Sequence, residues 1–338
     1  MQVIRGKRVL KYNQLGQTGI RISCLGIGTA TFGVAPLAED ADRLVGRAFD
    51  LGINLFDTAN SYGNQKRFDR PGAPPAHARL SAEEILGGTL VHRRQNVVLC
   101  SKVMESVGPG PSDSGLSRMH IFSQIDKSLQ RLRTDYIDIY YAHHPDPRTP
   151  VDETVGAMND LIKQGKIRHY ALSTFDAAEV TEVVRTCLRI NALPPVCNQI
   201  EYSIASRDAE LDTIPACQQF GLAIIAFGPL GGGLLAGRDV LSRPIIGDQR
   251  WGIEGFSERQ LTLAQRFSAI ADRRGIRPAP LALAWLAARP GVCSSVIGPE
   301  NVEELEISGV AADLDLSQDL LLEIDSLASI EAKVQFQH

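Results

Sequence analysis

Four residues of complementary chemistry follow short apolar runs in the first half of the chain. Asp57 ends the run that begins at Ile53, and Tyr62 follows it in the segment INLFDTANSYG. Lys102 ends the run in LCSKV, and His143 ends the run in IYYAHHPDP. A tyrosine holds its proton at neutral pH and can give it to a developing alkoxide, while a histidine can hydrogen-bond a substrate oxygen. These side chains predict hydride transfer coupled to proton transfer rather than hydrolysis.

The charges in this set fit the same chemistry. The carboxylate of Asp57 can hold Lys102 charged and aimed toward the phenol. An ammonium group near a phenol favours the phenolate, so we expect Lys102 to lower the pKa of Tyr62.

Two other kinds of site use some of the same residues. His143, His144 and Asp146 offer metal ligands, but adjacent histidines on an extended segment point in opposite directions, so we expect no metal site. A barrel glycosidase needs two carboxyl groups at strand ends, and Asp57 is the only clear candidate.

The second half of the chain offers residues that suit a nucleotide cofactor. Ser173, Gln199 and Phe227 end apolar runs, and a hydroxyl, an amide and an aromatic face can bind a flat carboxamide-bearing ring. The glycine-rich segment GPLGGGLLAGR, residues 228–238, follows Phe227, and a predicted helix begins after Gly298 in IGPENVEEL. Barrel enzymes bind phosphate at such places through backbone N–H groups and helix N-termini.

These residues belong to a regular alternation of short strands and helices. The strands are apolar on both faces, as buried parallel strands are, and they end near residues 28, 57, 102, 143, 173, 199, 227 and 298. Eight such units predict an α/β fold, the (β/α)8 TIM barrel, with an N-terminal β-hairpin over residues 9–14 and 19–23 and a C-terminal helix over 317–328. A doubly wound sheet would need a GxGxxG turn, and Gly26, Gly28 and Gly33 lack that spacing.

Helical spacing and capping signals predict the connecting helices. Ser81 and Glu84 form a capping-box pattern at the start of one of them. The predicted helices cover residues 39–51, 81–92, 116–133, 154–164, 177–187, 207–220, 258–273, 280–288 and 302–310. No linker or change of composition divides these elements, so we expect one domain over residues 1–338.

Two connections are longer than a barrel needs. Residues 64–79 and 105–115 are polar and rich in proline and glycine, and both follow strand ends. Long loops on the catalytic face of a barrel usually act as lids or specificity elements. A cleft framed by such loops favours a hydroxylated or bulky substrate, such as a sugar or a polyketide-like ketone.

Composition limits the other functions and locations. The 338 residues are 44% hydrophobic and 22% charged with a net charge of −4, which gives no basic excess for nucleic acid. The six cysteines have no paired spacing, so we expect neither a disulfide framework nor a zinc site. The N-terminus lacks an apolar signal core and the apolar runs are too short to span a membrane, which predicts a cytoplasmic protein with a small-molecule partner. Self-association is not indicated either way.

Nearly the whole chain resembles the aldo-keto reductase superfamily. The matching segments are LGQTGIRISCLGIGTATFG, GINLFDTANSYG, SAEEILG, SKV, TDYIDIYYAHHPDPRTPVDET, LIKQGKIRHYALSTF, NQIEYS and GLAIIAFGPLGGGLLAG. The resemblance implies a catalytic tetrad of Asp57, Tyr62, Lys102 and His143, with His144 at a position that faces the substrate or its edge. It also implies a nicotinamide over Phe227. The expected cofactor contacts are Ser173, Gln199, Phe227, Gly228, Leu230, Gly231, Gly233, Gly298, Glu300 and Glu304.

Several positions depart from the family pattern where the adenosine end of the cofactor is held. Relatives often carry Arg, Lys or Ser where Glu300 stands, and an acid–Asn pair at residues 307–308. They read SPLGRG where this chain reads GPLGGG, and SNF where it reads STF. A carboxylate repels a 2′-phosphate but accepts a hydrogen bond from a 2′-hydroxyl. Family habit favours NADP(H), NAD(H) stays open, and Arg238 is a possible compensating cation.

The resemblance implies an oxidoreductase that interconverts an aldehyde or ketone and its alcohol, with Tyr62 as general acid and base. One alternative is an NAD-preferring dehydrogenase of a sugar or similar hydroxylated substrate, which Glu300 favours. Another is a cofactor-sensing regulatory subunit on the same barrel, like the channel-associated β-subunits.

Overall fold

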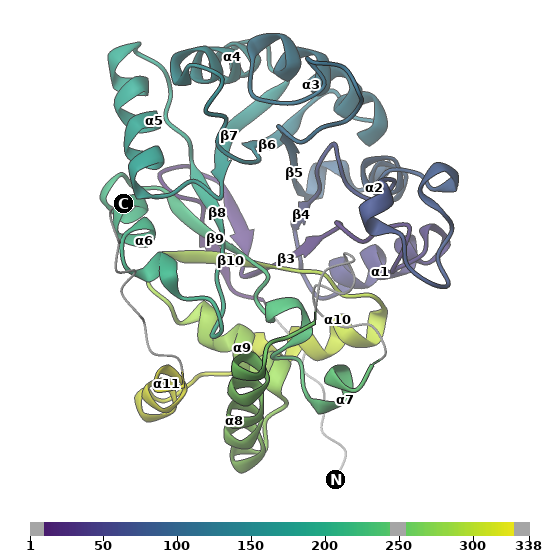
Figure 1. The fold of residues 1–338 in the computed structure, drawn as a ribbon, viewed down its shortest axis with the longest axis vertical. Helices are drawn as coiled ribbons and strands as arrows, with labels where there is room; N and C mark the ends of the chain where they lie inside the picture. Colours follow the sequence, from purple (N-terminus) through teal and green to yellow (C-terminus); the bar gives the residue numbers. More distant parts are fainter. Residues whose placement is uncertain (1–9, 244–254, 328–338) are drawn as a thin grey trace.

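Eight parallel strands form a closed barrel, which confirms the predicted (β/α)8 fold (Figure 1). The computed structural model describes residues 10–243 and 255–327. Around the barrel the strand order is β10, β3, β4, β5, β6, β7, β8 and β9, and β10 closes the ring against β3. Their bounds are Leu25–Gly28 (β3), Leu55–Asp57 (β4), Val98–Val103 (β5), Ile137–Ala142 (β6), Ile167–Ser173 (β7), Cys197–Glu201 (β8), Ala223–Phe227 (β9) and Val292–Ile297 (β10).

The barrel interior is a packed apolar core. Side chains from successive strands fill it, including Leu55, Cys100, Tyr141 and Ile225. A second, larger core lies between the strands and the surrounding helices. The strands are therefore buried on both faces, as their continuous apolar runs predict.

The predicted N-terminal hairpin closes the end of the barrel where the strands begin. Strands β1 (Tyr12–Gln14) and β2 (Arg21–Ser23) pair antiparallel, and the turn between them places Leu15 and Ile22 in the interior core. The Asn13 side-chain amide donates to the Cys293 carbonyl at this end, which ties the hairpin to β10. Residue 9, the predicted start of the hairpin, lies outside the described residues.

Helices cover the outside of the barrel, and α1 and α10 lie side by side with α2 and α9 as their next neighbours (Figure 1). The α2 helix begins with the predicted capping box, in which Ser81 accepts from the Glu84 amide and Glu84 accepts from the Ser81 amide. The bounds are Ala38–Asp50 (α1), Ala82–Leu90 (α2), Arg118–Leu132 (α3), Val151–Lys163 (α4), Ala177–Arg189 (α5), Thr213–Gln219 (α6), Arg238–Leu241 (α7), Glu258–Arg274 (α8), Pro278–Ala287 (α9), Val302–Gly309 (α10) and Gln318–Asp325 (α11).

The predicted helix over residues 207–220 is wrong in its first half. Asp208–Glu210 form a separate 3-10 turn, and α6 begins only at Thr213. Pro215 explains the break, because proline lacks an N–H group and fits a helix only in its first turn. The α4 helix begins three residues before the predicted residue 154, directly after Pro150, and the short α7 was not predicted at all.

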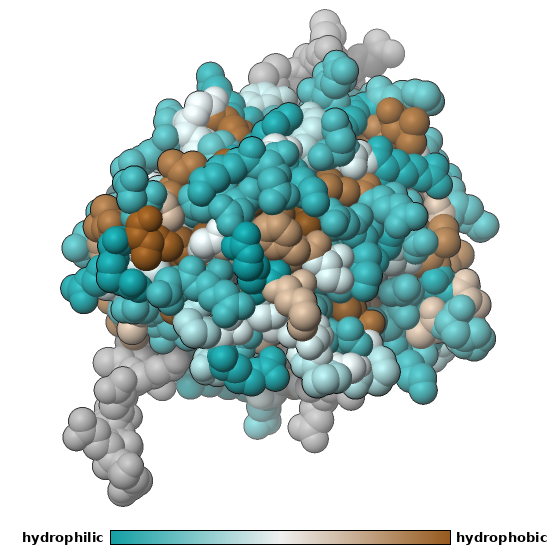
Figure 2. Space-filling view, turned by 90° about the horizontal axis from the view of Figure 1, so that it is seen from above, coloured by the Kyte–Doolittle hydropathy of each residue, from teal (hydrophilic) through white to brown (hydrophobic). Residues whose placement is uncertain are grey.

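Other sequence expectations concern the surface and the thiols. All six cysteines are buried and free. Within the described residues, no helix combines the length and the apolar character needed to cross a membrane. On the face drawn in Figure 2, apolar residues are scattered in separate groups among hydrophilic ones.

Candidate active site

Three neighbouring strands bring the predicted carboxylate, ammonium and imidazole together. Asp57 is the last residue of β4, Lys102 lies near the end of β5, and His143 follows β6 directly. Because β4, β5 and β6 are hydrogen-bonded neighbours, their ends open onto the same rim of the barrel. The Lys102 ammonium donates to Asp57 Oδ1 and to the Thr58 carbonyl, the latter at 2.9 Å, and its side chain is fully buried.

Asp57 has a second buried partner that sequence reasoning missed. Gln199 Nε2 donates to Asp57 Oδ2 at 2.9 Å across the barrel from β8. Both carboxylate oxygens of Asp57 are therefore engaged, one by a cation and one by an amide. The pattern of strand ends predicted that Gln199 reaches this rim, but strand ends carry no information about which residues meet across a barrel.

Tyr62 and His143 are in direct contact. The Tyr62 hydroxyl lies 3.2 Å from His143 Nε2, and the two rings meet edge to face with centroids 5.6 Å apart. Lys102 Nζ lies 4.9 Å from the centroid of the Tyr62 ring. The structure thus brings all four sequence-predicted residues into one connected cluster.

His143 is neutral in this environment. Burial holds the pKa of its imidazole well below the usual value, and the charge of Lys102 acts in the same direction. Among residues 10–243 and 255–327, no hydrogen-bond partner reaches the buried Nδ1. An unpaired buried N–H group is more costly than an unpaired lone pair, so we assign the ring proton to Nε2, which faces Tyr62.

Lys102 lowers the pKa of Tyr62, as expected, but burial has the larger and opposite effect. Burial raises the pKa of the phenol above its usual value and outweighs the opposing charge of Lys102. Asp57 reinforces the rise, because its carboxylate disfavours a second negative charge nearby. Tyr62 therefore holds its proton at neutral pH and above.

A glycine fixes the loop that carries Tyr62. Gly63 has a φ of +90°, and a Cβ there would lie 2.7 Å from the Ala82 nitrogen and 3.0 Å from the Phe32 carbonyl oxygen. This close approach lets the Ala82 amide donate to the Tyr62 carbonyl at 3.0 Å. The start of α2 therefore holds the backbone of Tyr62 in place.

The long 64–79 loop is organised around one buried arginine. The Arg79 guanidinium donates to the carbonyls of Gly63, Gln65 and Pro74 and to the Asp69 carboxylate, and its side chain is 1% exposed. These bonds tie the two ends of the loop to each other. Sequence analysis predicted the loop on the catalytic face, but it gave no sign that the loop has a polar core of its own.

Other side chains of this loop reach the cluster of Asp57, Tyr62, Lys102 and His143. The buried Phe68 meets the Tyr62 ring edge to face, with centroids 6.2 Å apart. Arg67 lies over the Phe68 ring and 3.7 Å from Glu105, which belongs to the second long loop. Glu105 in turn lies 2.9 Å from His144 Nε2. The two loops therefore form a charged rim beside Tyr62.

The expected divergence of the two histidines is wrong. The rings of His143 and His144 stack with centroids 4.7 Å apart and planes 9° apart. Strand β6 ends at Ala142, so the alternation of side chains no longer applies to these residues. Asp146 is engaged elsewhere, since it accepts from the Leu116 amide and the Thr149 hydroxyl.

Glu105, His143 and His144 each offer an atom within 4.8 Å of the others, which is a possible metal-ligand grouping. Both ring nitrogens of His144 already have partners, Thr174 Oγ1 at 2.7 Å and Glu105 at 2.9 Å. Parallel rings also direct their lone pairs along parallel planes instead of toward one point. We therefore interpret the grouping as a hydrogen-bonded cluster.

The residues expected to face a nicotinamide lie together on the opposite side of the rim. Ser173 and Gln199 are paired in register on β7 and β8 and are buried, while Phe227 ends β9 partly exposed. After Phe227, Gly228, Gly231, Gly232 and Gly233 all have φ between 56° and 102°. Within this turn the Gly231 amide donates to the Gly228 carbonyl at 2.8 Å and the Gly233 amide donates to the Leu230 carbonyl at 3.1 Å. The donors and the aromatic face present here fit a nicotinamide dinucleotide.

The expected compensating cation is a different arginine. Arg238 is largely exposed and pairs with Asp272 at 3.4 Å, on the outer surface. Glu300 instead pairs with Arg70 of the 64–79 loop at 2.9 Å and lies 4.0 Å from Arg243. Glu300 therefore does not present an uncompensated charge. Arg70 has no strand or helix pattern around it and lies 230 positions from Glu300, so no sequence signal could have paired them.

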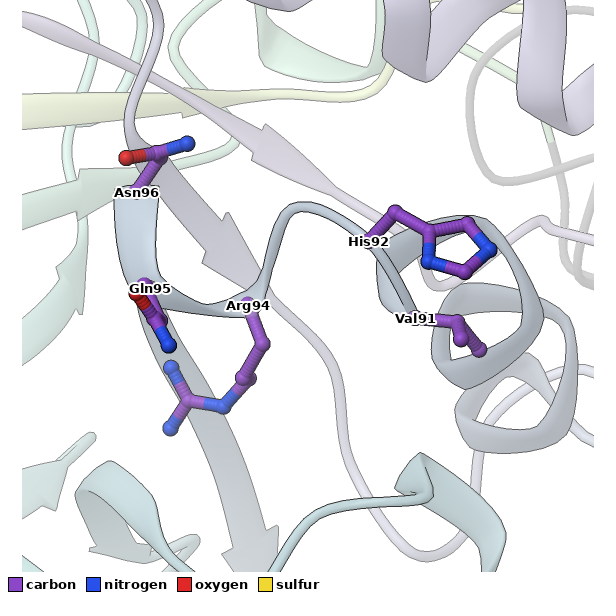
Figure 3. A pocket seen from close by; sticks show the side chains of 5 residues that line it. All are labelled: Val91, His92, Arg94, Gln95 and Asn96. Atoms are coloured by element: carbon purple, nitrogen blue, oxygen red, sulfur yellow. The ribbon is translucent and has the colours of Figure 1, made fainter.

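A surface hollow of about 340 Å³ is lined by none of these residues. Figure 3 shows the side chains that line it. Val91, His92, Arg94, Gln95 and Asn96 line it, between the end of α2 and the start of β5. The Arg94 side chain also donates to the Tyr136 carbonyl at the start of β6. These residues lie where strands begin, and in barrels that end supports stability whereas the opposite end carries the chemistry.

Comparisons with known proteins agree on one family. The sequence model of the family described as "Aldo/keto reductase family" matches residues 24–329. The chain is 34% identical over 319 residues to "Uncharacterized oxidoreductase YrpG" of Bacillus subtilis (strain 168), which covers 92% of this chain and 94% of that protein. It is 33% identical over 318 residues to "Probable voltage-gated potassium channel subunit beta" of Oryza sativa subsp. japonica, with 88% and 92% covered.

Proposed function

Since the chain belongs to the aldo/keto reductase family, whose members are NAD(P)H-dependent oxidoreductases, we propose that Tyr62 is its general acid and base in the interconversion of a carbonyl compound and an alcohol. The observation that carries this proposal is the contact of the Tyr62 hydroxyl with neutral His143 beside a buried lysine. It supplies two proton donors and one fixed positive charge at one point of the rim.

Each side chain has a distinct role in this mechanism. Tyr62 gives its proton to the substrate oxygen, and His143 donates a second hydrogen bond to the same oxygen from Nε2. Their 3.2 Å separation allows one acceptor to reach both. The Lys102 ammonium stabilises the phenolate that Tyr62 becomes, and Asp57 keeps that ammonium in place. The raised pKa of Tyr62 keeps the acid protonated before the reaction.

The cofactor in this proposal is a nicotinamide dinucleotide, with NADP(H) favoured over NAD(H). When bound, it supplies the hydride that the carbonyl carbon receives. Ser173 and Gln199 would hold its carboxamide, Phe227 would stack on its ring, and the turn from Gly228 to Gly233 would receive its phosphates. Gln199 has an amide nitrogen engaged by Asp57, so its role toward the carboxamide falls to the carbonyl oxygen.

A hydroxylated substrate suits the rim beside Tyr62. Arg67, Glu105 and His144 present a cation, a carboxylate and an imidazole there, and such groups bind hydroxyls better than apolar surface. A panel of sugars, hydroxyketones and aromatic aldehydes tests this specificity. Turnover restricted to small aromatic aldehydes would contradict it.

The test of the mechanism is Tyr62→Phe, which removes only the proton donor. We expect turnover to fall by about 10²–10⁴-fold, the usual contribution of a positioned acid. Binding of NADPH should stay within about twofold, as measured by quenching of protein fluorescence. Tyr12→Phe is the matched control, because that tyrosine lies on the hairpin and bonds the Gly52 carbonyl. Near-normal turnover in Tyr62→Phe would overturn the assignment.

A second candidate is a cofactor-sensing subunit, which the similarity to a probable potassium channel β-subunit supports. In that case the purified protein would retain bound dinucleotide yet leave every carbonyl compound in the panel unchanged. An NAD-preferring dehydrogenase is the other alternative, and a clear preference for NADH over NADPH in the same binding experiment would favour it.

A further inference from the structure

Four charged side chains form an alternating chain at the end of β10. Arg70 pairs with Glu300 at 2.9 Å, and Arg243 pairs with Glu304 at 2.8 Å while lying 4.0 Å from Glu300. They come from three separate segments: the 64–79 loop, the segment after α7, and the turn that begins α10. Arg70 and Glu300 are mostly buried, with 16% and 19% of their side chains exposed.

The location is one where barrels bind phosphate. It follows the last strand of the barrel, and the α10 helix begins beside it at Val302. In barrels, the loops after the seventh and eighth strands commonly form a phosphate site. Two guanidinium groups that converge there supply the planar, charged donors that phosphate oxygens prefer.

The two glutamates occupy these arginines in the protein as it stands. The two arginines and the two glutamates neutralise one another, so the cluster carries no net charge. A phosphate can replace the carboxylate of Glu300 as the partner of Arg70, because it offers more acceptor oxygens and more charge. Without Arg70, the same Glu300 would repel that phosphate.

We propose that Arg70, which the 64–79 loop carries to the end of β10, binds the 2′-phosphate of the adenosine ribose and thereby selects NADP(H) over NAD(H). Glu300 is a positioning residue that holds Arg70 at the site before the cofactor arrives. This inference rests on the proposed use of a nicotinamide cofactor. Relatives often carry a basic side chain at position 300. In this protein Arg70 of the 64–79 loop would supply that positive charge instead.

The loop gives Arg70 the rigidity that such a role needs. Arg79 anchors the loop through four acceptors, and Phe68 packs against Tyr62. One short segment therefore touches both the proton donor and the 2′-phosphate site.

The experiment measures equilibrium binding of NADPH and NADH to the full-length protein by isothermal titration calorimetry. For Arg70→Met we expect the Kd of NADPH to rise about 10–100-fold, and the Kd of NADH to stay within about twofold, since charged hydrogen bonds have this strength. For Glu300→Gln we expect tighter NADPH binding, because the glutamine oxygen still accepts a hydrogen bond that positions Arg70 while the competing negative charge is removed. Arg238→Met is the matched control and should leave both constants unchanged.

The outcomes separate this inference from the function on which it rests. Adenosine 2′-monophosphate, tested as a fragment, should lose affinity in Arg70→Met, whereas adenosine 5′-monophosphate should not. An equal loss for both dinucleotides, or no loss for NADPH, would overturn the role of Arg70 while leaving the carbonyl chemistry intact. Absence of binding by either dinucleotide to the unmodified protein would instead overturn the proposed function. Unchanged NADH binding in Arg70→Met also confirms that the variant is folded.

Discussion

The Lys102–Asp57 pair and the Arg70–Glu300 pair join the same kinds of charges in opposite settings. Lys102 and Asp57 lie on adjacent strands, with 0% and 4% of their side chains exposed. Arg70 and Glu300 lie on a loop and a turn and retain partial contact with water. A buried pair on strands holds one geometry, whereas a rim pair on loops can exchange its partner.

Their surroundings explain the difference. Lys102 also donates to the Thr58 carbonyl, and Asp57 also accepts from Gln199, so desolvation of both charges is offset by further hydrogen bonds. Arg70 and Glu300 lie on a loop and a turn at the rim, with 16% and 19% of their side chains exposed. The comparison teaches that burial between strands keeps a charge in place, whereas partial exposure on loops leaves a charge accessible to a ligand.

The strongest test of this comparison is Lys102→Met. It leaves the Asp57 carboxylate buried without a cation, which should lower the free energy of unfolding by about 3–5 kcal/mol. Turnover should fall about 10²–10⁴-fold, because the phenolate of Tyr62 loses its stabilising charge. Urea unfolding and steady-state kinetics measure the two effects. Lys163→Met is the control, since Lys163 is exposed on α4, and its stability should change by less than about 0.5 kcal/mol. Normal stability of Lys102→Met would break the distinction between the pairs.

A smaller effect is expected for Arg79→Met, which sharpens the comparison by releasing only the loop. Several buried carbonyls lose their donor, so the free energy of unfolding should fall by about 1–3 kcal/mol. NADPH should bind about tenfold more weakly, because Arg70 loses its support. Turnover at saturating cofactor should change little, since Tyr62 is held by α2. Arg118→Met, on an exposed pair with Asp160, is the control. A loss of turnover with unchanged NADPH affinity would contradict this division of roles.

The smallest effect concerns the pH dependence of stability. Because the pKa of His143 is lowered in the folded protein, its contribution to stability is complete above the unfolded value near 6.5. It is lost as the pH falls from there toward the lowered pKa. The protein should therefore lose stability on acidification by up to about 1.4 kcal/mol per pH unit from this residue. Urea unfolding at pH 7.5 and pH 5.5 measures this loss. Between these two pH values the free energy of unfolding should fall less in the His143→Gln variant than in the unmodified protein. Equal losses in both proteins would contradict a neutral, buried His143.

Sequence patterns predicted the barrel and the meeting of the four rim residues because both depend on local signals. Apolar runs define the strands, and parallel strands bring their ends to one rim. Contacts across the rim depend on side-chain reach instead. The bonds of Gln199 to Asp57 and of Arg70 to Glu300 join residues more than 100 positions apart. No periodicity encodes them.

Other differences have local causes that a pattern does not resolve. The stacking of His143 on His144 follows from the end of β6 at Ala142, one residue earlier than predicted. The raised pKa of Tyr62 reflects the depth of burial, which a loop position in the sequence does not indicate. Both cases depend on where an element ends or on what covers it.

The closure of the 64–79 loop has a consequence for protein engineering. The amide of Ala82 donates to the Tyr62 carbonyl, and Arg79 donates to the Gly63 carbonyl, so both ends of the insertion meet at one base. Arg79 organises the backbone of the loop from within, while Arg67, Phe68 and Arg70 contact residues outside it. The segment therefore resembles a cassette whose transfer also requires those outside partners. Grafted between the corresponding tyrosine and helix of another barrel, it would carry a cation to the end of the eighth strand without altering the strands of the barrel.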